Sequence, residues 1–192
     1  MPTGVALRDV REQLFDAADR ILLRSGPEAL TSRAVTEGAG CAKGVLHRHF
    51  ADFDAFLAEY VLDRANRMDT EVLGLRDAAG TGTVTGNVAA ALTSLFGSVA
   101  VAIVALVTFR DGLRARLRET WPAGVPVLTD AAVMIGDYLE DERARGRVAA
   151  GADTATLGSV LIGTGHLLFA DRTGDPPAPE RVLRTVETII PA

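Results

Sequence analysis

The stretch Leu30–Phe50, LTSRAVTEGAGCAKGVLHRHF, predicts two short helices joined by a tight turn. Thr31 or Ser32 can accept a hydrogen bond from one of the free N–H groups at the start of the first helix. Gly38 and Gly40 are expected to end that helix, because glycine adopts the left-handed conformation without a Cβ clash. A second helix is expected directly after these glycines.

This second helix is predicted to run from Ala42 to His49, with one face packed inward and one face exposed. Val45, Leu46 and Phe50 form the inward face. The residues expected to point outward are Lys43, Gly44, His47 and Arg48. Two helices joined by a few residues that include glycine form a helix-turn-helix, whose second helix enters the major groove of DNA.

The stretch and its flanks also carry a family resemblance. The residues that carry it are Gly26, Leu30, Thr31, Arg33, Val35, Ala39, Gly40, Lys43, Gly44, Leu46 and Phe50, followed by the run from Asp52 to Leu57. Over residues 8–68 this pattern resembles the N-terminal domain of the tetracycline-repressor (TetR) family of bacterial regulators, and beyond residue 68 the resemblance is architectural only. The resemblance implies a homodimer held by a four-helix bundle that the last two helices of each subunit form.

Five positions depart from the pattern that the resemblance implies. Ser32 replaces an apolar residue, Thr36 replaces an alanine, and Cys41 replaces a valine. His47 stands where the family usually has a phosphate-contacting tyrosine, and Phe53 stands where it usually has a lysine. The last two departures concern the anchoring of the chain to the DNA backbone more than the fold.

Composition and charge limit the class of protein. Of the 192 residues, 48% are hydrophobic, which is enough for a sizeable core. The net charge of −5 argues against a protein that coats nucleic acid without specificity, since such binding depends on many lysines and arginines. Residues 24–50 are nevertheless locally positive, because Glu28 and Glu37 are their only acidic residues. The basic residues and histidines of this segment are Arg24, Arg33, Lys43, His47, Arg48 and His49.

One cysteine cannot form an internal disulfide and no signal-like sequence opens the chain, so a cytoplasmic protein is expected. The segment from Val84 to Phe109 carries no charged residue, which makes a membrane-spanning helix one alternative. Its strongest apolar run covers only about eleven residues, whereas a bilayer requires roughly 17 to 25. Two buried helices are the preferred interpretation, and no membrane partner is expected.

Apolar residues recur at helical spacing along the rest of the chain, with no strand pattern, which predicts an all-α fold of about nine helices. The helices predicted outside the opening stretch cover residues 6–25, 52–75, 84–96, 99–119, 126–146, 154–171 and 179–190. Residues 1–50 are predicted to form a three-helix DNA-binding domain, with the helix-turn-helix at 31–50. Residues 51–192 are predicted to form a larger helical domain for ligand binding and dimerisation.

Candidate metal ligands and catalytic residues are few. Cys41, His47 and His49 lack the paired spacing and the fourth donor of a zinc site. His166 has no acidic residue three or four positions away, and no nucleophile or phosphate-loop motif occurs. No metal, cofactor or enzymatic activity is therefore predicted.

The second domain supplies candidate residues for an effector and for a dimer interface. Those expected to line a chamber, with plain core as the alternative for each, are Phe96, Val99, Ile103, Phe109, Trp121, Met134, Tyr138 and His166. The segment 154–171 is apolar on nearly all sides, which predicts its burial against a second subunit. The residues expected at that interface are Leu157, Leu161, Leu168, Val182, Val186 and Ile189.

These observations predict a DNA-binding regulator, a homodimeric repressor that binds a palindromic double-stranded operator and is released by a small, largely apolar effector. Phosphate contacts are expected from Thr31, Arg33, Lys43, His47 and Arg48, with Ser32 beside them. Base-edge contacts are expected from Ala42, Gly44, Val45 and His49, with Val45 against a thymine methyl group. Two alternatives are a membrane-anchored DNA-binding protein and a helical carrier or enzyme that contains a similar pair of helices.

Overall fold

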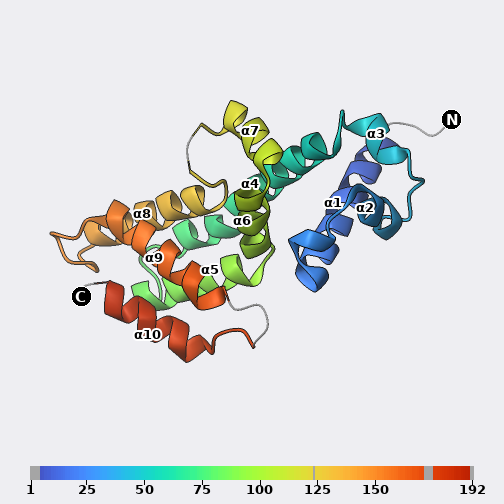
Figure 1. Ribbon diagram of the computed structural model, residues 1–192. Coiled ribbons are helices and arrows are strands. Elements are labelled where there is room, and N and C mark those ends of the chain that lie inside the picture. The colour runs from blue at the N-terminus through green and yellow to red at the C-terminus, as the bar shows by residue number, and fades with distance from the viewer. Residues whose placement is uncertain (1–4, 123, 171–174, 191–192) are drawn as a thin grey trace. The chain divides into compact units, whose positions relative to one another are not determined.

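The computed structural model describes residues 5–122, 124–170 and 175–190, and all its regular elements over these residues are helices (Figure 1). The prediction of an all-α fold is therefore confirmed. The eleven helices in this part of the chain are α1 (Val5–Ser25), the 3₁₀ helix η1 (Pro27–Ala29), α2 (Ser32–Gly38), α3 (Val45–His49), α4 (Phe53–Asp77), α5 (Val84–Gly97), α6 (Ala100–Phe109), α7 (Asp111–Thr120), α8 (Leu128–Ala144), α9 (Thr154–Phe169) and α10 (Pro179–Ile189).

Packing divides the chain into two compact units. The first unit contains Met1–Asp63 and Ala102–Ala123, and the second unit contains Arg64–Val101 and Gly124–Ala192. The predicted domain boundary at residue 50 stays a prediction, because a division by packing does not decide where a DNA-binding domain ends.

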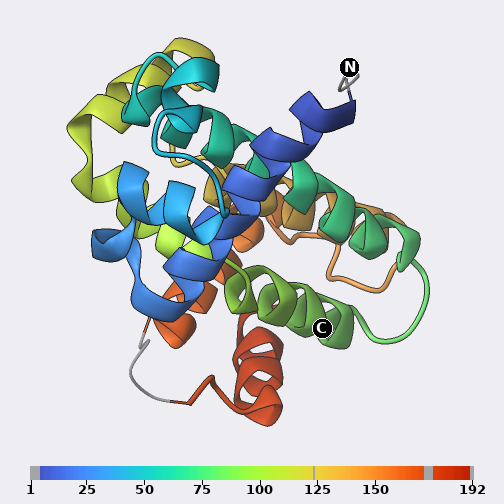
Figure 2. The ribbon, with the colours of Figure 1, turned by 90° about the vertical axis from the view of Figure 1, so that its right-hand side faces the viewer.

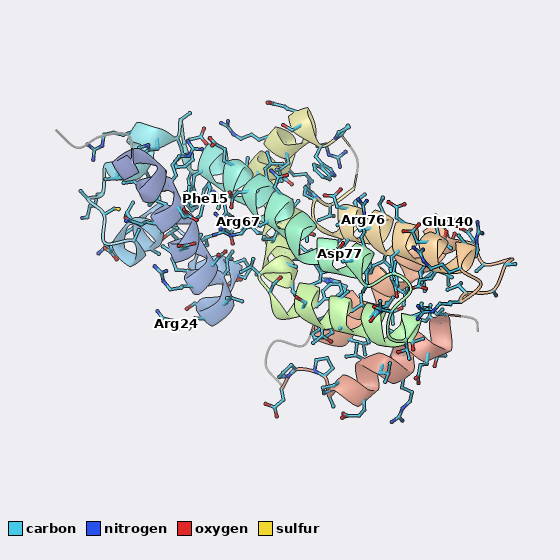
Figure 3. All side chains as sticks on the ribbon, turned by 180° about the vertical axis from the view of Figure 1, so that it is seen from behind. Phe15, Arg24, Arg67, Arg76, Asp77 and Glu140 are labelled. Atoms are coloured by element: carbon cyan, nitrogen blue, oxygen red, sulfur yellow. The ribbon has the colours of Figure 1, made fainter. Side chains whose placement is uncertain are left out.

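An aromatic cluster forms the core of the first unit. The ring of Phe15 on α1 (labelled in Figure 3) lies 5.6 to 6.2 Å from the rings of Phe50, Phe56 and Tyr60. Phe56 and Tyr60 are completely buried, and the Tyr60 hydroxyl is 2.6 Å from the Asp19 carboxylate, to which it donates. Because such rings bury large apolar areas, they fix the start of α4 against α1 and against the end of α3.

Close helix contacts at glycine organise the second unit, in which α9 lies beside α8 and α10 lies beside α5 (Figures 1 and 2). A Cβ at Gly158 on α9 would overlap the backbone carbonyl oxygen of Ala132 on α8. A Cβ at Gly165, further along α9, would lie 2.5 Å from the ring of Phe96 on α5. Glycine at these two positions therefore lets α9 approach both neighbouring helices.

A buried polar network holds the connection between α4 and α5 against α8. Glu142 is completely buried; its Oε1 accepts a hydrogen bond from the Gly80 N–H at 2.9 Å, and its Oε2 lies 3.3 Å from the guanidinium of Arg147. The side-chain amide of Asn87 donates to the Tyr138 hydroxyl at 3.0 Å. Burial raises the pKa of Tyr138 to about 12, and the neighbouring carboxylate of Glu142 acts in the same direction.

One predicted helix, over residues 99–119, is wrong. The helix expected over residues 99–119 is two helices, because Arg110 is extended at φ −122° and separates α6 from α7. Asp111 then begins α7, where an acidic residue is favoured by the helix dipole. At the start of α4, Asp52 caps the helix, since its side chain accepts a hydrogen bond from the Ala55 N–H at 2.8 Å.

No single helix in the described ranges is long and apolar enough to cross a membrane. Taken together, α5 and α6 have the length and composition of a span, but they are bent at the break between them. Val88, Leu92 and Ile103 in these two helices are at most 2% exposed, so the protein itself covers them.

Candidate nucleic-acid interface

The first helix of the predicted pair begins as its sequence indicates. The Thr31 side chain caps α2 by accepting a hydrogen bond from the Ala34 N–H at 3.1 Å. Val35 and Thr36 are buried, and the Thr36 hydroxyl lies 3.0 Å from the carbonyl oxygens of Ser32 and Arg33. A threonine at position 36 is thus accommodated, because its hydroxyl finds backbone acceptors on its own helix.

Glycine ends α2 and turns the chain toward α3. The helix stops at Gly38, and Gly40 takes the left-handed conformation at φ 66°. The Cys41 N–H donates to the Thr36 carbonyl oxygen at 2.9 Å, which closes the end of α2. The predicted end of this helix at the two glycines is confirmed.

The second helix is shorter than predicted. It begins at Val45, whereas Lys43 and Gly44 form a turn in which the Val45 N–H donates to the Ala42 carbonyl oxygen at 2.9 Å. Glycine is a poor helix former, so a start at Ala42 is not favoured. The predicted inward face is confirmed, since Leu46 is completely buried and Phe50 is 3% exposed.

The outward side of this segment carries the candidate DNA contacts. Ala42, Lys43, Gly44, His47 and Arg48 are exposed. Among the residues that the structure describes, none forms a hydrogen bond or an ion pair with the side chain of Lys43, His47 or Arg48. Three polar side chains around α3 are thus available to phosphate oxygens.

Three other predicted contact residues lie in less open surroundings. His49 is half-buried, with its ring centroid 6.4 Å from that of Phe50. Arg33 is exposed but its guanidinium pairs with Glu37 at 2.8 Å, four residues on. Val45 is only 9% exposed, so the predicted contact with a thymine methyl group has too little accessible surface.

In the described part of the chain, no three His, Cys, Asp or Glu side chains gather closely enough to hold a metal ion. Cys41 is a free, half-buried thiol whose Sγ lies 3.6 Å from the Ala39 carbonyl oxygen.

The eight residues predicted to line an effector chamber are divided between the two units, and within the second unit the rings of Phe96 and His166 have centroids 6.1 Å apart. Ile103, Phe109 and Trp121 belong to the first unit, where Phe109 is 87% exposed. Phe96, Val99, Met134, Tyr138 and His166 belong to the second unit. Phe96, Val99 and Tyr138 are buried in the core of the second unit, whereas Met134 and His166 are half-buried.

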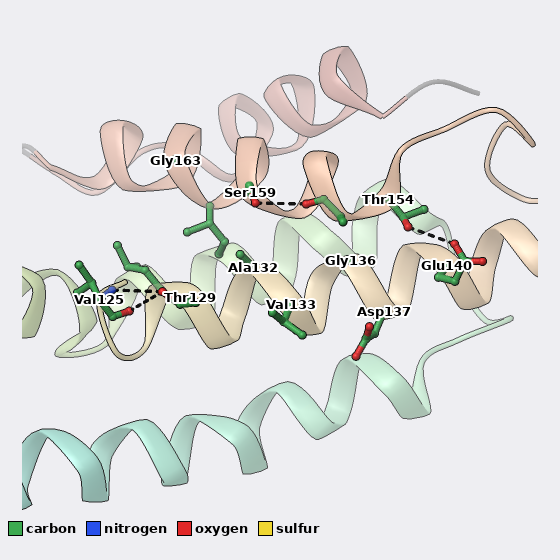
Figure 4. Close-up of a pocket in the computed structure, with 13 residues that line it drawn as sticks. Val125, Thr129, Ala132, Val133, Gly136, Asp137, Glu140, Thr154, Ser159 and Gly163 are labelled. Atoms are coloured by element: carbon green, nitrogen blue, oxygen red, sulfur yellow. Dashed lines mark hydrogen bonds between the residues drawn. The ribbon is translucent and has the colours of Figure 1, made fainter. Parts of the chain in front are cut away.

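A cavity of about 560 Å³ lies instead along the groove between α8 and α9 (Figure 4). Its lining is mainly apolar or small, including Val125, Leu128, Ala132, Gly136, Ile162 and Gly163, and none of the eight predicted residues belongs to it. Among the described residues that line it, Asp137 and Glu140 are the charged ones. Glu140, labelled in Figures 3 and 4, pairs with Arg143 at 2.6 Å, and Asp137 lies 3.5 Å from Arg76.

The residues predicted at a dimer interface are largely covered by their own chain. Leu161, Val182 and Val186 are at most 1% exposed, which leaves them no surface for a second subunit. Leu157, Leu168 and Ile189 are half-buried. Among the side chains that the structure describes in the second unit, the large apolar ones that are exposed are Val133 (58%) on α8, and Val160 (43%) and Leu167 (77%) on α9.

The comparisons with known proteins agree with this geometry. Residues 14–60 match the family model described as bacterial regulatory proteins, tetR family. No curated protein matches the sequence.

Similar solved structures cover nearly the whole chain. A Rhodococcus sp. protein assigned to the TetR family of transcriptional regulators is 16% identical, with a TM-score of 0.70 over 95% of this chain and 99% of its own. Escherichia coli NemR in its reduced form is also 16% identical, with a TM-score of 0.70 over 94% and 97% of the two chains. The transcriptional regulator FadR from Bacillus subtilis, in complex with stearoyl-CoA, is 17% identical, with a TM-score of 0.65 over 91% and 96%. Residues 14–60 therefore match the tetR family of bacterial regulatory proteins, and the chain as a whole shares its fold with these solved structures.

Proposed function

We propose that the chain is a transcriptional repressor that binds a near-palindromic operator as a homodimer and is released by a small, largely apolar effector. One observation carries the DNA-binding part of this proposal: Lys43, His47 and Arg48 surround α3 of a helix-turn-helix with exposed side chains that no described residue engages. Positive and polar groups of this kind bind phosphate oxygens and orient a recognition helix in the groove.

The contacts can be assigned by position. Lys43, His47 and Arg48 would bind phosphates, supported by Thr31, Ser32 and Arg33 at the start of α2. Ala42 and Gly44 precede α3 and would lie closest to base edges, together with the accessible edge of His49. Val45 is left out of this assignment because it belongs to the core.

Homodimerisation would present two helix-turn-helix units to one operator. The exposed apolar side chains of Val160 and Leu167 flank the exposed Gly163 on one face of α9. An apolar face of this kind favours burial against a second copy, and a two-fold axis through it would relate the two recognition helices. The operator half-sites would then be one helical turn, or a small multiple of it, apart.

The groove between α8 and α9 is the proposed effector site. Its mainly apolar lining favours an apolar ligand. Because Gly163 belongs both to this groove and to the exposed face of α9, a ligand here would adjoin the proposed dimer interface. The ligand would release DNA by binding more tightly to a conformation of the dimer in which the distance between the two helix-turn-helix units does not match the operator.

A DNA-binding measurement tests the assignment around α3. An operator would be selected from genomic fragments, and affinity would be followed by fluorescence anisotropy over a series of salt concentrations. Lys43→Ala and Arg48→Ala should each weaken binding and lower the magnitude of the salt slope by about one. Arg184→Ala, an equal change of charge at an exposed position on α10, is the matched control and should leave both quantities unchanged. Equal affinity of the α3 variants and the unmodified protein would rule out this assignment.

A further inference from the structure

Two acidic residues stand at the start of α4, immediately beyond the proposed recognition helix. Asp52 and Asp54 flank Phe53, the first residue of α4, and α3 ends at His49 only three residues earlier. Carboxylates this close to the proposed DNA surface would repel phosphate oxygens if they were unpaired.

Both carboxylates are paired with arginines from the segment around α7, which belongs to the same unit. The guanidinium of Arg116 on α7 lies 2.5 Å from Asp52 Oδ2. Arg110, which precedes α7, lies 2.5 Å from Asp54 Oδ1, and its guanidinium carbon is 5.2 Å from the centroid of the Phe53 ring. Three consecutive residues at the start of α4 are therefore held by two arginines.

A third contact brings the backbone of α7 against the same point. A Cβ at Gly112, in the first turn of α7, would overlap Asp54 Oδ2. The Asp54 carboxylate thus lies against the N-terminal end of α7, where a negative charge is favoured by the helix dipole. Glycine at position 112 is what permits this close approach.

We propose that Arg110 and Arg116 are positioning residues for DNA binding, which fix the start of α4 and thereby the orientation of α3. We call this set of contacts the α4 clamp: Arg116 with Asp52, Arg110 with Phe53 and Asp54, and Gly112 against Asp54. This inference rests on the proposed function, since it assigns a role in DNA recognition to residues outside the helix-turn-helix.

The arginines act through α4 rather than by contact with DNA. Each has a carboxylate partner at 2.5 Å, and about 60% of each arginine side chain is covered, since the exposed fractions are 39% for Arg110 and 41% for Arg116. Each guanidinium is thus already held by a carboxylate of α4 or its N-cap. The α4 clamp therefore stabilises a position of α3, and its loss lowers affinity without removing a phosphate contact.

The test compares Arg116→Gln and Asp52→Asn with the unmodified protein on a selected operator. Asparagine is as good an N-cap as aspartate, so Asp52→Asn removes the ion pair while keeping the hydrogen bond to the Ala55 N–H. Each variant should weaken operator binding about two- to fivefold, the range that partly exposed ion pairs support. The double variant should bind the operator with about the affinity of whichever single variant binds less tightly, because both changes break the same contact.

Four readouts separate positioning from simple electrostatics. Asp52→Asn removes a negative charge beside the DNA, so electrostatics alone would strengthen binding, whereas the α4 clamp requires weaker binding. Arg116→Gln should leave the salt slope unchanged, and Arg116→Lys should restore most of the affinity. Arg118→Gln, an equal charge change on the same helix, should have no effect, since its side chain is exposed and reaches only the Pro122 carbonyl oxygen at 3.5 Å. Stronger binding by Asp52→Asn, a slope reduced by about one in Arg116→Gln, or an equal effect of Arg118→Gln would each overturn the inference.

A measurement without DNA keeps this inference distinguishable from the proposed function. Amide hydrogen exchange over residues 50–57 should be faster in Arg116→Gln than in Arg118→Gln, because the start of α4 opens more often when the clamp is broken. Equal exchange in the two variants would reject the α4 clamp. Faster exchange together with a protein that selects no DNA would instead leave the clamp in place and reject the proposed function.

Discussion

Gly40 and Gly44 flank the turn of the helix-turn-helix, but only one of them requires glycine. Gly40 has φ 66° and Gly44 has φ −82°, and a Cβ at either position would meet no atom within 4 Å. A side chain would have room at both positions, so only the backbone conformation makes glycine necessary at Gly40 and not at Gly44.

Gly40→Ala should lower the free energy of unfolding by about 1 to 2 kcal/mol, because an L residue in the left-handed region crowds its own carbonyl oxygen. Urea denaturation at neutral pH would measure the change. Gly44→Ala is the matched control and should be neutral or slightly stabilising. An equal loss in both variants would mean that the turn is not set by the conformation of Gly40.

Tyr138 gives stability a dependence on alkaline pH. Its pKa rises from 10.0 to about 12 in the folded protein, mainly because of burial. Below pH 10 both the folded and the unfolded chain keep the phenolic proton. Between pH 10 and about 12 the unfolded chain loses it first, so the free energy of unfolding falls as the pH rises through this window.

The measurement compares two variants that both carry Tyr60→Phe, so that Tyr138 is the only tyrosine left in one of them. With Tyr138 present, stability should fall more steeply above pH 10 than in the variant that also carries Tyr138→Phe. Tyrosinate absorbance would follow the same group directly. Parallel stability curves would contradict a raised pKa.

Residue types indicated which surface carries the candidate site, and they did so for a physical reason. Lys43, His47 and Arg48 cannot be buried without a partner, and the structure exposes all three. Val45 satisfied two patterns at once, as an inward residue and as an apolar base contact, and only its burial decides between them. The pairing of Arg116 with Asp52 joins residues 64 positions apart, and no local pattern signals such a contact.

At the scale of elements, the contact between α8 and α9 depends on Gly158. A side chain there would overlap the Ala132 carbonyl oxygen, and a backbone atom cannot rotate away as a side chain does. Gly158→Ala should therefore lower the free energy of unfolding by about 1 to 3 kcal/mol, as overpacked cores do.

Gly74→Ala is the matched control for this change, since Gly74 is an exposed helical residue of the same unit with no atom near its Cβ position. It should raise stability by roughly 0.5 to 1 kcal/mol through helix propensity. Thermal unfolding followed by circular dichroism would compare the two. A stable Gly158→Ala protein would show that α9 can move away from α8 without loss.

Most helices could be predicted because their apolar spacing and their ends are local properties. Thr31, Asp52 and the glycines at 38 and 40 mark ends through hydrogen bonds or backbone angles set within a few residues. The break at Arg110 could not be predicted in this way. Its guanidinium pairs with Asp54, 56 residues away, and neither segment alone contains that information.

At the scale of the whole molecule, the proposed dimer depends on the exposed apolar face of α9. Leu167 is 77% exposed in the single chain. Leu167→Glu should convert the dimer to a monomer, because an unpaired carboxylate at an apolar interface costs several kcal/mol. The affinity for the operator should fall as well, since the helix-turn-helix of a monomer binds only one half-site.

Sedimentation velocity would report the change in assembly. Thr188→Glu, which adds the same charge at an exposed position on α10, should remain dimeric. If Leu167→Glu sediments like the unmodified protein, the interface lies elsewhere.

Some features of the whole molecule could be predicted from the sequence, whereas the dimer interface and the groove could not. Helical content follows from local pattern, and the burial of α9 on one side follows from its apolar sequence. An apolar pattern does not say whether a side chain is buried by its own chain or by a second copy. The pattern therefore predicts Leu161, Val182 and Val186 at the dimer interface, although their own chain covers them. The groove between α8 and α9 is lined mainly by small residues such as Ala132, Gly136 and Gly163, whereas composition drew attention to the aromatic ones.

Lys43 is the only lysine of this chain, and its ammonium group is exposed in the turn before α3. Amine-directed chemistry therefore has a single side-chain target in the chain, beside the helix proposed to read the operator. A fluorophore or a photo-cross-linker can be coupled at that point without introducing a cysteine. Acylation of this one nitrogen would remove its charge, so modification of a single atom would lower the affinity of the proposed helix-turn-helix for DNA.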